Sequence, residues 1–311
     1  MYEQITRNKR RSVIVAVLFV LVWMGIGAGV GALGGSSGTR GDGAITGMVV
    51  AAILALLGVL WALSSGRNLV LRASGAVPAD PVTYKQLHNV VEELALADGI
   101  SKPDVYVIND PSPNAFATGI SPKKAAITAT TGLLETMNRE ELEGVISHEM
   151  SHIKNYDVRL ILIVSTLIGM AAILASIVWR IGFFARPRGK DSGQILLVIF
   201  AAGAALTIVA VIVGPLIKLA LSRSRESLAD VSGVELTRNP AGLIKALKKL
   251  QANDKPFAKF NHATASMCID DPLQHHEQWF HRLFDTHPPI DQRIAVLEKI
   301  AGGPVTQPTT P

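Results

Sequence analysis

The sequence predicts a mainly α-helical α+β protein in which apolar helices interrupt a small polar domain, and three observations carry this prediction. Hydrophobic residues make up 49% of the 311-residue chain, and the mean hydropathy is +0.32. The apolar residues gather in long blocks, which is typical of membrane-spanning helices. The polar segments between the blocks alternate between helical and strand periodicity, as in a compact α+β domain.

Four apolar blocks approach or exceed the ~20 residues that a helix needs to cross a bilayer. These blocks are residues 13–33, 44–63, 160–179 and 195–221. They predict two N-terminal transmembrane helices and a second hydrophobic helical hairpin. The first block is too long, and too poor in a polar cleavage region, to be a signal peptide. The expected order is a membrane hairpin, a first domain part, a second hairpin, a second domain part and a disordered tail, at residues 1–72, 73–159, 160–221, 222–301 and 302–311.

Basic residues next to the blocks predict the orientation, because lysine and arginine are enriched on the cytoplasmic side of membranes. Both ends of the first hairpin are basic, at residues 7–11 and 67–72, so the domain that follows is expected in the cytoplasm. The link between the third and fourth blocks contains four basic residues between Arg180 and Lys190. Two interpretations of the second hairpin stay open. Either both segments span and export the basic link against the rule, or the hairpin is shallow and keeps its charges near the cytoplasmic face.

The segment between the hairpins predicts the elements of a small soluble domain. Apolar residues recur at helical spacing in residues 81–97, which predicts an amphipathic helix. Residues 105–108 and 125–130 have the short pattern of strands, and a turn is expected between them at residues 111–113. Asn138 followed by Glu141 predicts a capped start for the next helix.

That helix carries His148-Glu149-Met150-Ser151-His152, an H-E-x-x-H segment. Positions i and i+4 lie on one face of a helix, so His148 and His152 can present imidazole nitrogens to a single metal ion with Glu149 beside them. The same residues could instead form a polar helix face with surface histidines. A second acidic helix later in the chain makes that alternative poor.

Residues 222–230 read S-R-S-R-E-S-L-A-D, which in a helix places Glu226 and Asp230 on one face. Zinc hydrolases use three protein ligands and leave a fourth position for water. Glu226 can complete the set with the two histidines, while Asp230 accepts a hydrogen bond from a ligand imidazole. Glu149 can then serve as general base and acid while the water attacks a peptide carbonyl. Alternatively, the two acidic residues lie on an exposed helix and pair with neighbouring arginines.

Four segments of the chain together carry a family resemblance. They are Asn114–Gly119, His148–Asp157, Ser222–Asp230 and His287–Ile294. With these motifs in this order, the chain resembles the M48 family of integral-membrane zinc metalloproteases, and in particular its bacterial heat-shock protease branch. The resemblance implies a gluzincin-like fold, one zinc ion (Zn2+) bound by His148, His152 and Glu226, and catalysis by Glu149. It also implies a multi-pass protein of the bacterial inner membrane that cleaves misfolded or damaged membrane proteins on the cytoplasmic side, with possible quality-control partners.

Three further residues are candidates for the site. A donor aimed at the developing carbonyl oxyanion contributes ~3 to 4 kcal/mol to peptide hydrolysis, and by the resemblance His287 and Arg293 can supply one. His287 could instead cap the helix that follows, and Arg293 could pair with Asp291 or Glu298 on that helix. Asn114 is expected to hold the backbone of an extended substrate beside an edge strand, unless it is an ordinary turn-forming asparagine.

Charge and composition argue against other classes. The net charge is +5, but the basic residues cluster beside the apolar blocks, where membrane lipids are the expected partners, so nucleic-acid binding is not expected. The sequence contains no Gly-rich phosphate loop, so no nucleotide is expected either. The single cysteine, Cys268, allows no intrachain disulfide. Zinc is expected by precedent for a site with two histidines and one glutamate, because other first-row metals bind such ligands too.

Two alternatives to a quality-control protease remain. One is a processing protease of the same family with a narrow substrate. The other is a membrane regulator in which the metal only ties two helices together. The intact Glu149 argues against the regulator, because a structural metal site has no use for a base beside an open coordination position.

Overall fold

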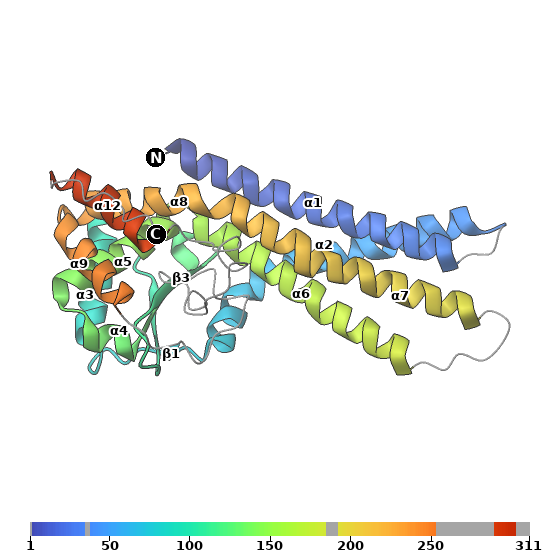
Figure 1. Ribbon diagram of the computed structural model, residues 1–311, viewed down its shortest axis with the longest axis horizontal. Coiled ribbons are helices and arrows are strands. Elements are labelled where there is room, and N and C mark those ends of the chain that lie inside the picture. The colour runs from blue at the N-terminus through green and yellow to red at the C-terminus, as the bar shows by residue number, and fades with distance from the viewer. Residues whose placement is uncertain (1, 35–37, 185–191, 253–288, 303–311) are drawn as a thin grey trace, which may run out of the picture. The chain divides into compact units, whose positions relative to one another are not determined.

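The structure of the chain, a computed structural model, describes residues 2–34, 38–184, 192–252 and 289–302. The described residues form two compact units. The first, here called the sheet unit, contains residues 2–8, 67–162 and the described residues from 218 onward; the second, the helical unit, contains residues 9–66 and the described part of 163–217. The predicted fold class, a mainly helical α+β chain with two hydrophobic hairpins, is confirmed (Figure 1). The expected domain bounds stay a prediction, and the tail after Gly302 lies outside the described residues.

Within the described residues, four helices are long and apolar enough to cross a membrane, judged by length and composition. They are α1 (Tyr2–Gly34), α2 (Arg40–Ala73), α6 (Asp157–Phe184) and α7 (Ser192–Ile208). Each covers one of the apolar blocks that the sequence predicts. The fourth block differs, because α7 passes into a π-helical stretch, Val209–Val213, and then into α8 (Gly214–Thr237). Among the residues whose side chains are described, the candidate span there is Gly193–Val211.

Small residues let the helices of the helical unit approach closely. A Cβ on Gly27 of α1 would lie 2.3 Å from the carbonyl oxygen of Gly47 on α2, so this contact requires glycine. Across the second hairpin, Trp179 Nε1 on α6 donates a 3.0 Å hydrogen bond to Thr207 Oγ1 on α7. Each hairpin is thus held by its own contacts.

A four-stranded sheet forms the centre of the sheet unit, with the strand order β1-β2-β4-β3. The strands are β1 (Val77–Pro78), β2 (Asp104–Ile108), β3 (Ala115–Gly119) and β4 (Ala125–Thr130), and a 3₁₀ turn, Pro122–Lys124, precedes β4. β2 and β4 are parallel, whereas the two edge strands pair antiparallel with them. The sequence predicts β2 and β4 but gives no bounds for β1, which has two residues, or β3, which is rich in alanine and glycine.

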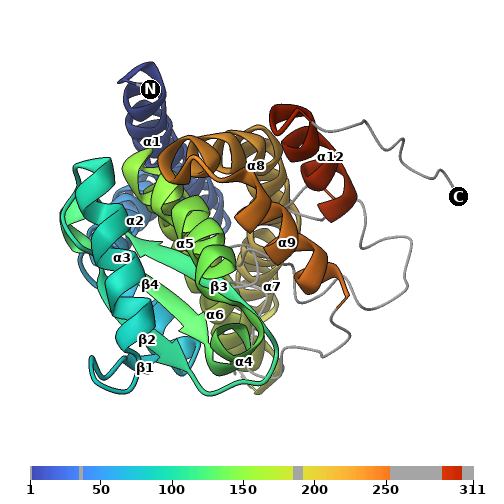
Figure 2. The same ribbon diagram turned by 90° about the vertical axis from the view of Figure 1, so that its left-hand side faces the viewer.

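Both faces of the sheet carry buried side chains. Successive side chains of a strand point to opposite sides, so one strand contributes to two cores. Ala115, Ala117 and Ile127 face one apolar core, and Phe116 and Ile108 face another. The first core is covered by α3 (Lys85–Asp98), α5 (Arg139–Lys154), α9 (Pro240–Gln251) and α12 (Ile290–Ile300). In Figure 2, α3 and α5 lie over the sheet and α9 lies beside α5. A short helix, α4 (Thr131–Thr136), links β4 to α5. The sheet and these helices fix α5, which carries the H-E-x-x-H segment.

The predicted amphipathic helix exists as α3, but it begins at Lys85 and not at Pro81. The Asp80 carboxylate accepts hydrogen bonds from both the backbone N–H and the hydroxyl of Thr83, each at 2.7 Å. An aspartate that bonds locally in this way favours a turn over a helix. The chain therefore turns once before the helix starts.

Candidate metal centre

The start of α5 is fixed by the capping box that the sequence predicts. Asn138 Oδ1 accepts a hydrogen bond from Glu141 N at 3.0 Å, and Glu141 Oε2 accepts one from Asn138 N at 2.8 Å. Lys249 on α9 adds a 2.6 Å ion pair to the same Glu141 carboxylate. These contacts set where the helix begins, and the 3.6-residue period then turns His148, Glu149 and His152 toward the interior, where all three are buried.

A glycine on α8 brings the second acidic helix against α5. A Cβ on Gly233 would lie 3.0 Å from the backbone nitrogen of His148 and 3.1 Å from Ser147 Oγ. The two backbones approach closely because no side chain stands between them. Two turns earlier on α8, Glu226 then faces both histidines.

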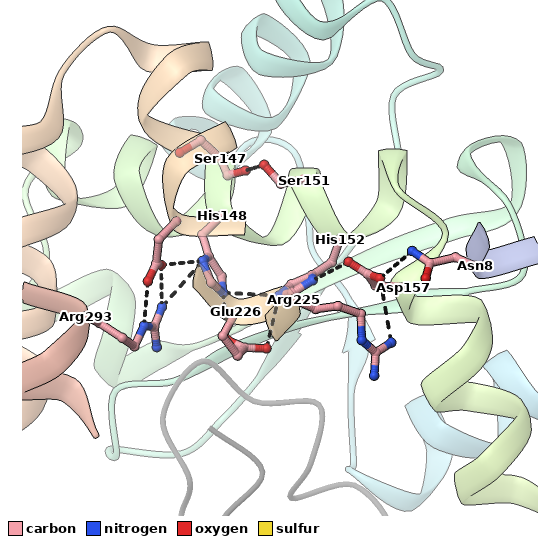
Figure 3. A network of polar contacts seen from close by, with 10 residues as sticks. Asn8, Ser147, His148, Ser151, His152, Asp157, Arg225, Glu226 and Arg293 are labelled. Atoms are coloured by element: carbon pink, nitrogen blue, oxygen red, sulfur yellow. Dashed lines mark hydrogen bonds and ion pairs between the residues drawn. The ribbon is translucent and has the colours of Figure 1, made fainter. Parts of the chain in front are cut away.

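His148, His152 and Glu226 form the one group of potential metal ligands found within the described residues, with ligand atoms all within 4.8 Å of one another. The two Nε2 atoms lie 3.2 Å apart. Each Nε2 lies 3.5 Å from a carboxylate oxygen of Glu226. Atoms bound to one tetrahedral zinc at ~2.0–2.1 Å are about 3.3 Å apart. The two histidine nitrogens have about this spacing, and Glu226 faces each of them with a different carboxylate oxygen, so the three side chains converge on one position (Figure 3).

The outer nitrogen of His148 is held by a buried ion pair. His148 Nδ1 lies 2.8 Å from Asp230 Oδ1. Arg293 on α12 donates to both oxygens of Asp230, at 2.9 Å through Nε and 2.7 Å through Nη2. Burial raises the pKa of Asp230, but the charge of Arg293 and the bond with His148 outweigh it and lower the pKa to about 2. Asp230 is therefore a permanent acceptor that turns His148 Nε2 toward the metal position.

The Asp230 carboxylate also changes the pKa of His148. Burial lowers the pKa of His148, whereas the hydrogen bond and charge of Asp230 raise it to about 9. A metal-bound imidazole must be neutral at its ligating nitrogen, so a metal that bound here would displace a proton from His148. The same Asp230 contact makes the imidazole a more basic ligand.

The outer nitrogen of His152 meets a different carboxylate. Its Nδ1 lies 3.2 Å from Asp157 Oδ2, and Asp157 is itself buried. Arg225 Nη1 lies 3.6 Å from Asp157 Oδ1, and Asn8 Nδ2 lies 2.7 Å from the same oxygen, as Figure 3 shows. The sequence places Asp157 in the run after the second histidine but assigns it no role, and nothing in the sequence points to Asn8. Both are positioned to orient His152.

The remaining candidates are placed as follows. Glu149 is 2% exposed and lies on α5 directly after His148. Asn114 lies at the start of edge strand β3, where its Oδ1 accepts from Ala115 N at 2.9 Å and its own N–H donates to Thr130 Oγ1 at 2.9 Å. Arg293 contacts Asp230, a partner that the sequence does not indicate. His287 lies outside the described residues.

Comparisons with known proteins agree with this geometry. The sequence matches Peptidase family M48 over residues 81–301. It is 40% identical over 309 residues to a Protease HtpX homolog from Streptococcus thermophilus, covering 96% of this chain and 100% of that protein. It is 42% identical over 305 residues to a Protease HtpX homolog from Caldanaerobacter subterraneus, covering 96% and 98%. The crystal structure of S. mikatae Ste24p has a similar fold, with a TM-score of 0.52 and 16% identity over 96% of this chain and 67% of that one.

Proposed function

This chain belongs to peptidase family M48 and is a multi-pass, membrane-bound metalloprotease. From that premise, we propose that its metal is a zinc ion bound by His148, His152 and Glu226. The observation that supports this ligand set is that the two imidazole Nε2 atoms lie 3.2 Å apart, and that each lies 3.5 Å from one of the two carboxylate oxygens of Glu226. Two imidazole nitrogens and one carboxylate are a donor set typical of catalytic zinc. When bound, zinc lowers the pKa of a coordinated water and polarises the substrate carbonyl.

Glu149 is the general base in this proposal. It directly follows one ligand on α5, and the described structure buries it to 2% exposure. A carboxylate in such a position can take the proton of the attacking water and later deliver it to the leaving amine. General acid–base catalysis of this kind contributes roughly 10²–10⁴-fold to the rate.

Asp230 and Arg293 orient the first histidine. Because both oxygens of Asp230 accept from Arg293, the guanidinium is already engaged in the described structure, and a positioning role fits its contacts. His287 is then the remaining candidate for the oxyanion donor, from the sequence alone. Asn114 is proposed to meet an extended substrate at edge strand β3, because the outer side of β3 lacks a strand partner within the described sheet.

The expected substrates are unfolded or damaged membrane proteins, cleaved on the cytoplasmic side of the bacterial inner membrane. The four apolar helices support a protease that meets its substrates at the bilayer. The basic residues at both ends of the first hairpin support the cytoplasmic placement. Partners in membrane quality control belong to the same proposal.

The test is to compare the detergent-purified wild type with Glu149→Gln. The wild type is expected to contain about one zinc per chain and to cleave casein, with activity lost on chelation and restored by zinc. The variant is expected to keep its zinc and its unfolding temperature while losing cleavage. Loss of zinc from the variant would contradict the assignment of Glu149 as the base, and bound zinc without cleavage by the wild type would favour the regulator.

A further inference from the structure

A buried polar residue near the start of α1 contacts the support of the second histidine. Asn8 is 2% exposed. Its side-chain Nδ2 donates to the backbone oxygen of Asn155 at 2.8 Å and to Asp157 Oδ1 at 2.7 Å. These partners are 147 and 149 residues away in the sequence. Both partner atoms are acceptors, so the nitrogen and not the oxygen of the Asn8 amide must face them.

The contacts of Asn8 continue to the proposed metal position. Asp157 uses Oδ1 for Asn8, and its other oxygen, Oδ2, faces His152 Nδ1 at 3.2 Å. The opposite nitrogen of that ring, Nε2, faces His148 and Glu226. Asn8 therefore contacts the carboxylate oxygen of Asp157 that does not face His152.

The turn that Asn8 holds is a strained one. Tyr156, between the two partners of Asn8, has φ of 60°, which is the left-handed region that non-glycine residues rarely adopt. The turn ends α5 and starts α6, so Asp157 has to be aimed back at His152 from the beginning of a new helix. One Asn8 amide restrains both the backbone of this turn and the carboxylate that follows it.

We propose that Asn8 is a positioning residue for the metal ligand His152, acting through Asp157. The inference rests on the proposed zinc site and extends it to a residue of the N-terminal helix. Carboxylates that hold a ligand imidazole typically change metal affinity or activity by 10–100-fold when they are lost, and Asn8 acts one contact further out. The expected effect of removing the Asn8 amide is therefore about a tenfold loss of zinc affinity.

The test uses purified full-length protein with three variants. Asn8→Ala removes the donor, and Asn8→Asp keeps the shape but sets a carboxylate against Asp157. The control is Asn68→Ala, which changes an exposed asparagine on α2. For each variant, three quantities are measured: the zinc dissociation constant by chelator competition, kcat and KM for casein, and the unfolding temperature of the metal-free protein.

Zinc affinity is expected to fall about tenfold in Asn8→Ala and further in Asn8→Asp, with a lower kcat and little change in KM. The control is expected to match the wild type. Adding Asp157→Asn to Asn8→Asp is expected to recover part of the lost affinity, because it removes the repulsion between two carboxylates.

Asn8→Ala with unchanged zinc affinity and kcat, and only a lower unfolding temperature, would show a structural role alone and overturn the inference. His152→Ala separates this result from a failure of the proposed site. If His152→Ala binds zinc as the wild type does, the ligand set itself is wrong, and the inference fails with it.

Discussion

His148 and His152 lie one helical turn apart on α5, yet the two rings are held in different ways. The first arm consists of His148, Asp230 and Arg293. In it, the carboxylate meets the ring at 2.8 Å and receives two hydrogen bonds from one guanidinium. All three side chains are almost fully buried. Such a bidentate ion pair defines both distance and orientation.

The second arm consists of His152, Asp157, Asn8 and Arg225. Its ring-to-carboxylate distance is longer, at 3.2 Å, and its closest donor to the carboxylate is a neutral amide at 2.7 Å. The guanidinium stands further away, at 3.6 Å. The Asn8 amide makes a single hydrogen bond to this carboxylate, whereas Arg293 makes a bidentate ion pair with Asp230. The comparison teaches that His148 is held by the ion pair of Asp230 and Arg293. His152 is held instead by Asp157, which depends on the turn at Tyr156 and on Asn8 at the start of α1.

Removing the ion pair of the first arm is expected to have the largest effect. Arg293→Met keeps much of the side-chain volume but leaves Asp230 as a buried charge without its guanidinium. The free energy of unfolding is expected to fall by about 3–5 kcal/mol, measured by thermal unfolding in detergent. Lys248→Met is the control. Lys248 on α9 forms an exposed ion pair with Glu298, which lies on α12 as Arg293 does. Equal losses in the two variants would remove the contrast between the arms.

Displacing α8 tests the first arm without changing a polar group. In Gly233→Ala the new Cβ would stand 3.0 Å from His148 N, so the helices must separate by a few tenths of an ångström. Overpacking of this kind costs typically 1–3 kcal/mol. We expect lower stability and reduced casein cleavage, measured together. Gly29→Ala, where a Cβ has open space around it, serves as the control and should leave cleavage unchanged.

Metal removal is expected to loosen the second arm more than the first. The measurement is amide hydrogen exchange by mass spectrometry, before and after chelation, on peptides covering residues 153–160 and 228–236. Exchange should increase about tenfold more in the first peptide, which contains the turn at Tyr156, because the Arg293 ion pair holds Asp230 without metal. Equal increases would show that the metal supports both arms alike.

The smallest effect is expected at the start of α5, outside both arms. Burial raises the pKa of Glu141, but the hydrogen bond and charge of Lys249 and the backbone hydrogen bond of Asn138 together outweigh it, so the net pKa lies below its ordinary value of 4.5. A lowered carboxylate pKa stabilises the protein above about pH 4.5, and this contribution is lost as the pH falls through the folded value. Glu141→Gln should cost less than ~1 kcal/mol at pH 7, because Lys249 is partly exposed, and progressively less as the pH falls through the folded value.

That pH dependence would be followed by thermal unfolding between pH 3 and 7, with zinc content as a second measurement. Zinc content is expected to stay at the wild-type level, since the capping contacts do not reach the histidines. A change in zinc content would mean that the two arms are not independent of the helix start.

Much of the fold and of the candidate site follows from local sequence patterns. The H-E-x-x-H spacing places His148 and His152 on one helix face, and the E-x-x-x-D spacing does the same for Glu226 and Asp230. The capping box of α5 is predicted from two residues, Asn138 and Glu141, and is present in the structure. Local patterns succeed in these cases because the interacting atoms are within about one turn of each other.

The rest depends on contacts between distant segments, which leave no periodic signal. Asn8 meets Asp157 across 149 residues, and Arg293 meets Asp230 across 63. From the sequence, Arg293 has two acidic neighbours on its own helix. Its contact with Asp230 depends on how α12 packs in the fold. The edge strand β3 is missed for another reason, because its alanine and glycine residues have low strand propensity and are accommodated by burial.

The two arms draw on opposite ends of the chain, Asn8 near its start and Arg293 near its end, so the order of synthesis separates them. The first turn of α1 leaves the ribosome at the start of synthesis, and α12 leaves it near the end. The two arms are therefore completed at different times: the second once α8 has emerged, and the first only after Arg293 has been added. A chain still being translated therefore holds both histidines without the guanidinium of the first arm until α12 has been added.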